Sequence, residues 1–150
     1  MRIDEFMNQS FIKLDLQATT KEGIIRELVQ VLDDAGVVKD FEELVNDVLV
    51  RESLTSTGIG LRIGLPHAKT AHILKPAIAF GRSVQGVDFD SMDQEKAHIF
   101  FLICMPEEGY NLHLKVLAML SRSLIQESFR EALETAETTA QVMQLLNQVE

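Results

Sequence analysis

Apolar residues recur along the first third of the chain with the spacing of two amphipathic helices. Thr19, followed three residues later by Glu22, predicts a capping box that starts the first helix, and Gly36 is expected to end it. One face of this helix carries Ile24, Ile25, Leu28, Val31 and Leu32. A second helix is predicted over 41–53, and its buried stripe is Phe41, Leu44, Val45, Val48 and Leu49.

Shorter apolar segments predict strands. Residues 11–16 alternate apolar and polar, and strands are also predicted over 61–65, 77–81 and 98–105. The last is almost entirely apolar, as expected for a strand covered on both faces. A helix over 110–125 follows, then one or two more, the final one started by Thr138 with Gln141 in capping-box spacing. Strands separated by helices predict an α/β fold, a three-layer α/β/α sandwich with a mixed sheet of about four to five strands.

Composition narrows the class of protein. The 150 residues are expected to form one domain over 1–150, with enough apolar residues (46%) to build a core without metals or disulfides. The net charge of −9 argues against nucleic-acid binding and suits a basic partner. No apolar run has the length of a membrane span and the first residues do not resemble a signal peptide, so a cytoplasmic protein without direct membrane insertion is expected.

The segment 51–70 contains the strongest candidate for chemistry. Pro66 has a fixed φ and lacks an N–H group, so the preceding strand is expected to stop there and leave His67 at a strand end beside the small Ala68. α/β folds often place reacting groups at such ends. Imidazole titrates near neutrality and can act as a neutral nucleophile. A lone histidine is more often structural, but the glycine-rich approach and the proline favour a functional His67.

His113 is a second candidate, in the first turn of the helix predicted over 110–125. It shares a helical face with Leu117, Leu120 and Leu124. This position fits a histidine at the edge of the core with one hydrogen-bond partner. It also fits a donor to a bound anion, because N–H groups and the helix dipole favour negative charge at a helix N-terminus.

Arg51 is the third candidate, at the end of the second helix. From the residues alone, a solvated arginine that complements the helix C-terminus is the better interpretation. Its forked guanidinium would also suit phosphoryl oxygens. Other signals are weaker: Cys104 lies in an apolar strand and is expected to be buried, and His72 and His98 are interpreted as residues without a role. The histidine spacing does not favour a metal site, so no metal and no cofactor are expected.

The sequence around these residues resembles the enzyme IIA domains of the fructose–mannitol type in the bacterial phosphoenolpyruvate:sugar phosphotransferase system. The similarity extends over the whole chain and includes 51–70, 76–83, 86–89, the strand that ends at Pro106 and the helix segment 113–122. Pro66 to Thr70 and Ala79 to Ser83 look more like the fructose branch. Two positions depart from the family: Gly64 replaces an alanine, and Arg62 replaces a small residue.

The resemblance implies a role for each candidate. His67 would accept a phosphoryl group on Nε2 from the phosphocarrier HPr and pass it to a cysteine of enzyme IIB, for uptake of fructose or a related sugar. His113 would be the second active-site histidine, and Arg51 the arginine of the site. The alternative is a nitrogen-regulatory enzyme IIA whose phosphorylation state controls partner proteins. A third possibility, an interaction domain that has lost the chemistry, is disfavoured by the presence of both His67 and His113.

Overall fold

A mixed sheet forms the centre of the computed structural model, which describes residues 1–108 and 111–149. The strand order is β1-β5-β6-β3-β2, and β4 also pairs with β6. The strands are β1 Ile12–Lys13, β2 Gly58–Gly60, β3 Ile63–Gly64, β4 His67–Thr70, β5 Ala77–Val87 and β6 Ala97–Pro106. The sheet therefore has six strands, not four to five.

The two long strands β5 and β6 are antiparallel and carry most of the apolar side chains of the sheet. Their register pairs Phe80 with Phe101, and both rings are fully buried in an edge-to-face contact with centroids 5.3 Å apart. On its other edge, β6 is parallel first to β3 and then to β4, with Ile63 opposite Ile99 and His67 opposite Ile103. β3 and β4 therefore follow one another along the same side of β6.

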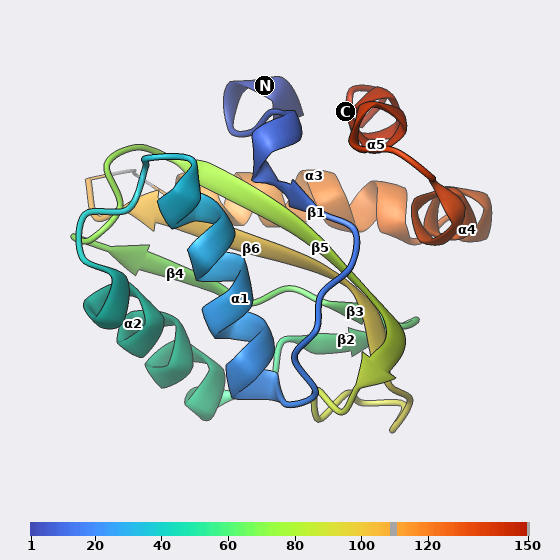
Figure 1. Cartoon of the computed structure of the whole chain (residues 1–150), viewed down its shortest axis with the longest axis horizontal. Helices are drawn as coiled ribbons and strands as arrows, with labels where there is room; N and C mark the ends of the chain where they lie inside the picture. Colours follow the sequence, from blue (N-terminus) through green and yellow to red (C-terminus); the bar gives the residue numbers. More distant parts are fainter. Residues whose placement is uncertain (109–110, 150) are drawn as a thin grey trace.

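Helices cover both faces of the sheet and confirm the three-layer α/β/α prediction (Figure 1). On one face lie α1 (Lys21–Asp34) and α2 (Phe41–Leu54), and on the other α3 (Leu112–Leu124) and α4 (Glu127–Thr135). The helix α5 (Thr139–Leu146) packs against the N-terminal 3₁₀ turn Gln9–Phe11, and another 3₁₀ turn covers Ile3–Glu5. Within the described ranges, no helix has both the length and the apolar character needed to cross a bilayer.

The predicted helices are present, and their ends show where sequence patterns mislead. The first helix is capped by Thr20 rather than Thr19, because the Thr20 side chain, on an extended backbone, accepts a hydrogen bond of 3.0 Å from Gly23 N. Gly36, with φ +81°, follows its end as expected. The capping box of Thr138 and Gln141 is confirmed. Tyr110, the predicted first residue of the third helix, lies outside the described residues.

All four predicted strands differ from the structure in their bounds. The predicted 11–16 strand is only two residues long in the structure, because residues 9–11 form a 3₁₀ turn; beyond it, Leu16 N still donates to Arg82 O of β5 at 2.9 Å. The 61–65 strand is interrupted, because Leu61 and Arg62 form the two-residue turn of a hairpin between β2 and β3. Strands β5 and β6 are longer than predicted, β5 by six residues at its C-terminal end (Val87 against Gly81).

Candidate active site

The approach to His67 is a tight hairpin held by side chains that are distant in the sequence. Leu61 and Arg62 have φ of 58° and 68°, the left-handed region that a type I′ turn requires and that glycine or asparagine usually occupies. Leu61 N donates to Asp93 Oδ2 at 3.0 Å, and the Arg62 guanidinium donates to Glu134 at 2.7 Å. The ion pair with Glu134 gives the unusual Arg62 a structural role.

The sequence predicted that His67 follows the last residue of a strand. In the structure it is instead the first residue of a strand, β4. Pro66 separates β3 from β4, and its carbonyl accepts a hydrogen bond of 3.0 Å from Ile103 N, so the chain stays attached to β6 as it passes from one short strand to the next. β3 already ends at Gly64, two residues before the proline, and Pro66, which has no N–H group to donate, still pairs with the sheet through its carbonyl. His67 is therefore fixed by a parallel register opposite Ile103.

One hydrogen bond sets the chemical state of the His67 ring. Its Nδ1 lies 2.9 Å from Leu65 O, and because a carbonyl can only accept, Nδ1 carries the proton and donates. In the neutral ring the lone pair is then on Nε2. Burial lowers the pKa of His67; the Leu65 hydrogen bond and the Glu52 charge oppose this effect, and Arg51 adds to it. His67 is therefore a neutral imidazole near pH 7, with a nucleophilic Nε2.

His113 lies across from His67, in the first turn of α3. The two ring centroids are 6.5 Å apart and their planes differ by 27°. The Nδ1 atom of His113 is buried and has no hydrogen-bond partner among the described residues. Burial, and then the charges of Lys69 and His67, lower the pKa of His113. Leu120 and Leu124, which were predicted to share a helix face with His113, are buried, so this face of α3 points inward as predicted.

The structure of Arg51 is compatible with both interpretations given above, a residue that complements the C-terminus of α2 and a residue that can bind phosphoryl oxygens. It lies in the last turn of α2, and its Nη1 donates to Thr55 O at 3.1 Å, just beyond the end of the helix. The same side chain lines a cavity together with His67 and His113. The guanidinium therefore complements the helix C-terminus and is also available to an anion in the cavity.

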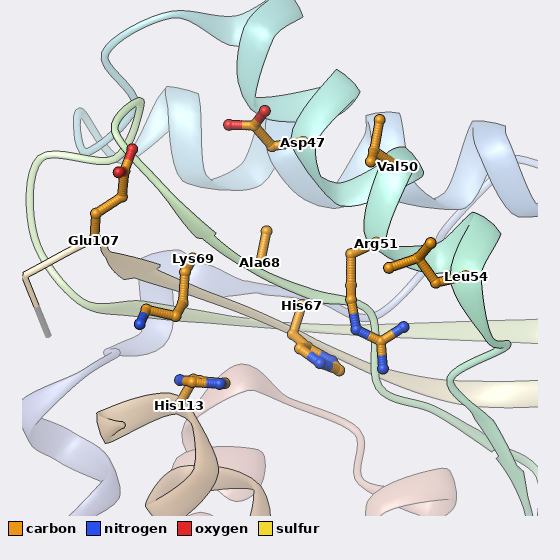
Figure 2. A pocket seen from close by; sticks show the side chains of 9 residues that line it. All are labelled: Asp47, Val50, Arg51, Leu54, His67, Ala68, Lys69, Glu107 and His113. Carbon is orange, nitrogen blue, oxygen red and sulfur yellow. The ribbon is translucent and has the colours of Figure 1, made fainter. Parts of the chain in front are cut away.

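The cavity is open to solvent, has a volume of about 650 Å³ and brings all three candidates together. Figure 2 shows His67, Arg51 and His113 reaching into it from β4, α2 and α3. Its lining is completed by Asp47, Val50, Leu54, Ala68, Lys69 and Glu107. A neutral nucleophile, a guanidinium and a second imidazole around one space suit the transfer of a phosphoryl group, whose oxygens carry the charge.

Three charged residues of the lining were not singled out from the sequence. Asp47 precedes Arg51 by four residues, the spacing of one helix face, and Lys69 follows His67 by two, the spacing of one strand face. These periods could have pointed to both. Asp47 accepts a hydrogen bond of 2.6 Å from the Thr70 hydroxyl, which ties α2 to β4. Glu107 directly follows β6, and no sequence spacing relates it to the site.

Residues expected to have no role lie outside this cavity. His98 Nδ1 bonds to Ser83 O at 2.9 Å, and the His72 backbone N donates to the Thr70 hydroxyl. Neither histidine lines the cavity. Cys104 is fully buried in β6, and burial raises the pKa of its thiol, as expected for a small apolar residue rather than a nucleophile.

The family model described as "Phosphoenolpyruvate-dependent sugar phosphotransferase system, EIIA 2" matches residues 5–149. The chain belongs to this EIIA family. It is a fructose/mannitol-type EIIA, and thus a phosphotransferase component of a sugar phosphotransferase system. The resemblance inferred from the sequence is confirmed.

Relatives of this EIIA occur both alone and within longer proteins. The chain is 44% identical over 148 residues to the PTS system fructose-specific EIIABC component of Bacillus subtilis, covering 99% of this chain but only 23% of that protein. It is also 44% identical over 138 residues to the PTS system fructose-specific EIIA component of Haloferax volcanii, covering 92% of this chain and 90% of that protein.

Solved structures of similar proteins share the fold. The nitrogen regulatory protein IIA-Ntr of Neisseria meningitidis has a TM-score of 0.88 at 29% identity, over 96% of this chain and 98% of that one. The mannitol enzyme IIA of Escherichia coli, in a complex with its phosphorylated enzyme IIB, has a TM-score of 0.79 at 29% identity, over 93% of this chain and 96% of that one.

Proposed function

We propose that this EIIA carries a phosphoryl group on Nε2 of His67, receives it from phospho-HPr and passes it to a cysteine of an enzyme IIB. The observation that carries the proposal is the hydrogen bond between His67 Nδ1 and Leu65 O. It leaves Nε2 as the nitrogen with the lone pair, in a residue that lines the cavity with Arg51 and His113. The chain is proposed to work in the cytoplasm, needing neither metal nor cofactor.

In the proposed transfer, the His67 Nε2 lone pair attacks phosphorus while the bond from phosphorus to the donor nitrogen of HPr breaks. The electron pair of that bond stays on the donor. His67 keeps its Nδ1 proton throughout, and Leu65 O stabilises the positive charge that the ring gains. Arg51 and His113 are proposed to donate hydrogen bonds to the equatorial oxygens, where negative charge must be held. Transfer to the enzyme IIB cysteine thiolate reverses these steps at His67.

Two findings support fructose or a related sugar as the cargo of the system and enzyme IIB as the acceptor. The Bacillus and Haloferax relatives, at 44% identity, are both named fructose-specific. The Escherichia coli structure is titled as a complex with phosphorylated enzyme IIB. The nitrogen-regulatory alternative has its own support in the TM-score of 0.88 to the Neisseria protein, although the identity is lower, at 29%.

A reconstituted relay tests the proposal. The purified chain is incubated with phosphoenolpyruvate, enzyme I and HPr, and intact mass then reports an acid-labile phosphoryl group. We expect His67→Ala to abolish the adduct, while the matched controls His72→Ala and His98→Ala keep it. Label retained in the His67 variant would overturn the assignment. Addition of a fructose-type enzyme IIB should discharge the adduct; phosphorylation without any discharge would favour the regulatory alternative.

A further inference from the structure

A buried carboxylate lies next to the site but does not line its cavity. Glu52, the neighbour of Arg51 in the last turn of α2, is only 6% exposed. Its Oε2 accepts hydrogen bonds from Thr57 N at 2.8 Å and from Lys21 Nζ at 2.9 Å, and its Oε1 accepts from the Thr57 hydroxyl at 2.5 Å. Buried charges require such partners. The carboxylate thus fixes Thr57, which is also buried, at two points.

Lys21 extends this cluster to two other parts of the chain. Its ammonium bridges Glu52 and Asp90, at 2.9 and 2.8 Å, and lies 4.9 Å from the centre of the Phe89 ring. The start of α1, the end of α2 and the loop after β5 therefore meet at one carboxylate. A cluster with these contacts has little freedom to move, because displacing Glu52 would leave charges and donors without partners.

Backbone hydrogen bonds continue from Thr57 to the His67 ring. Leu65 N donates to Thr57 O at 3.0 Å, and Leu65 O accepts from His67 Nδ1 at 2.9 Å. Thr57 thus fixes the backbone N–H group of Leu65, and the carbonyl group of Leu65 in turn orients the imidazole of His67. A continuous path of hydrogen bonds leads from Glu52 through Thr57 and Leu65 to the atom that decides which ring nitrogen of His67 has the lone pair.

We propose that Glu52 and Thr57 act as positioning residues, which hold Leu65 so that the His67 ring keeps its proton on Nδ1 and its lone pair on Nε2. Only the expected effect on the transfer rate rests on the proposed function; the effect on the His67 ring does not depend on it. Neither residue lines the cavity. Their effect is indirect, through the orientation and tautomer of the imidazole, which determine how well Nε2 can attack.

The negative charge of Glu52 acts on the pKa of His67 in the same direction as the Leu65 hydrogen bond that Glu52 is proposed to hold in place. Burial has the largest effect and lowers the pKa of His67; the Leu65 hydrogen bond raises it, Arg51 lowers it, and the negative charge of Glu52 raises it. The other titratable side chains around this cavity come from α2, β4, the end of β6 and α3: Asp47, Lys69, Glu107 and His113. Loss of the Glu52 charge should therefore lower the pKa of His67 further.

The test measures the His67 ring directly in the full chain, before any phosphorylation. Nitrogen-15 NMR of the imidazoles gives the tautomer and the pKa of His67 in Glu52→Gln, in Thr57→Val and in the unmodified protein. Thr57→Ser restores the hydroxyl and serves as the rescue. Glu27→Gln is the matched control, since Glu27 is a partly buried carboxylate that, like Glu52, accepts hydrogen bonds from the backbone and pairs with a lysine, here Lys13, away from the cavity.

We expect the unmodified protein, Thr57→Ser and Glu27→Gln to show the Nδ1-protonated tautomer. Glu52→Gln and Thr57→Val should show a mixture of tautomers, and Glu52→Gln should also lower the pKa of His67. Transfer from HPr per folded molecule should fall in Glu52→Gln by on the order of 10²-fold, the usual cost of a misplaced reacting group. Unchanged tautomer and transfer rate in both variants would overturn the proposal, and Thr57→Val decides it alone if Glu52→Gln does not fold. If His67 of the unmodified protein accepts no phosphoryl group, the proposed function fails, yet the tautomers still decide whether Glu52 and Thr57 position the ring.

Discussion

The β5–β6 pair and the segment 51–67 are neighbours, since β3 of this segment pairs with β6, but they are stabilised by different forces. In β6, residues 97–105 are buried apart from His98, and apolar packing against both helix layers fixes their position. In 51–67, the carboxylates of Glu52, Asp93 and Glu134 accept hydrogen bonds from Thr57 N, Leu61 N and the Arg62 guanidinium. These bonds hold a segment that includes two non-glycine residues with positive φ. Burial of apolar area is nondirectional, whereas a hydrogen bond fixes an atom in a defined direction.

This difference explains where the His67 ring lies. The strands β5 and β6, which form an apolar ladder, supply a rigid support. The segment 51–67 beside them, the polar segment, supplies the orientation that a nucleophile needs. His67 is placed where the two meet: its backbone pairs with Ile103 of β6, and its ring bonds to Leu65 of the polar segment. The predictions below separate these two contributions.

Among the predictions of this section, the largest effect concerns His113 of α3, which lies across the cavity from His67. His113→Ala should slow transfer from HPr by roughly 10²–10³-fold, because the equatorial oxygens lose a preorganised donor. His113→Gln, which keeps a donor, should recover part of the rate. Stopped-flow phosphorylation of variants with matched melting curves measures both. If His113→Ala accepted and discharged the phosphoryl group at unmodified rates, only a structural role at the core edge would remain.

The next effect concerns Gly64, where the apolar ladder meets the polar segment. A Cβ atom at this position would lie 2.9 Å from Phe100 Cδ1 and 3.2 Å from Phe89 Cδ2, and both rings are fully buried. Gly64→Ala should therefore lower the free energy of unfolding by about 1–3 kcal/mol, as overpacking does. Urea denaturation measures this loss, and Phe100→Leu should relieve part of it in the double variant. An alanine variant as stable as the parent would show that the rings can move aside.

The smallest expected effect is on the pH dependence of stability. Burial lowers the pKa of folded His67 below the value of about 6.5 in the unfolded chain. Between the two values only the unfolded chain binds the proton, so this stabilisation is complete above about pH 6.5 and is lost as the pH falls through the folded pKa. From about pH 7.5 to about pH 5.5, the unmodified protein should therefore lose more unfolding free energy than His67→Gln. Equal losses in the two proteins would contradict the lowered pKa.

The helices and the apolar ladder could be predicted from the sequence, because periodic burial leaves a periodic pattern. The stripe of Leu44, Val45 and Val48 and the strand over 97–106 are examples. The predicted strand over 61–65 was wrong at Leu61 and Arg62, because the turn at these residues depends on partners that are 32 and 72 residues away, whereas Ile63 and Gly64 do form a strand. No local pattern records such contacts.

In the candidate site, too, some residues could be found from the sequence and others could not. His67, Arg51 and His113 were found through a motif and a family resemblance, and the structure brings them to one cavity. Glu52 was missed, because a glutamate beside an arginine at a helix end resembles a solvated surface residue. Its burial results from Lys21, 31 residues earlier, and from Thr57 in the following loop. A tautomer, likewise, can be read only where the ring and its carbonyl are seen together.

The central claim is that the phosphoryl group resides on Nε2 of His67, and the position of the label on the ring tests it most directly. The chain, labelled with nitrogen-15 in its histidines, is phosphorylated by phosphoenolpyruvate, enzyme I and HPr, and the nitrogen–phosphorus couplings are then recorded. We predict one coupled nitrogen, Nε2 of His67, with Nδ1 of the same ring still protonated. A coupling to Nδ1 of His67, or to any nitrogen of His113, His72 or His98, would contradict the account.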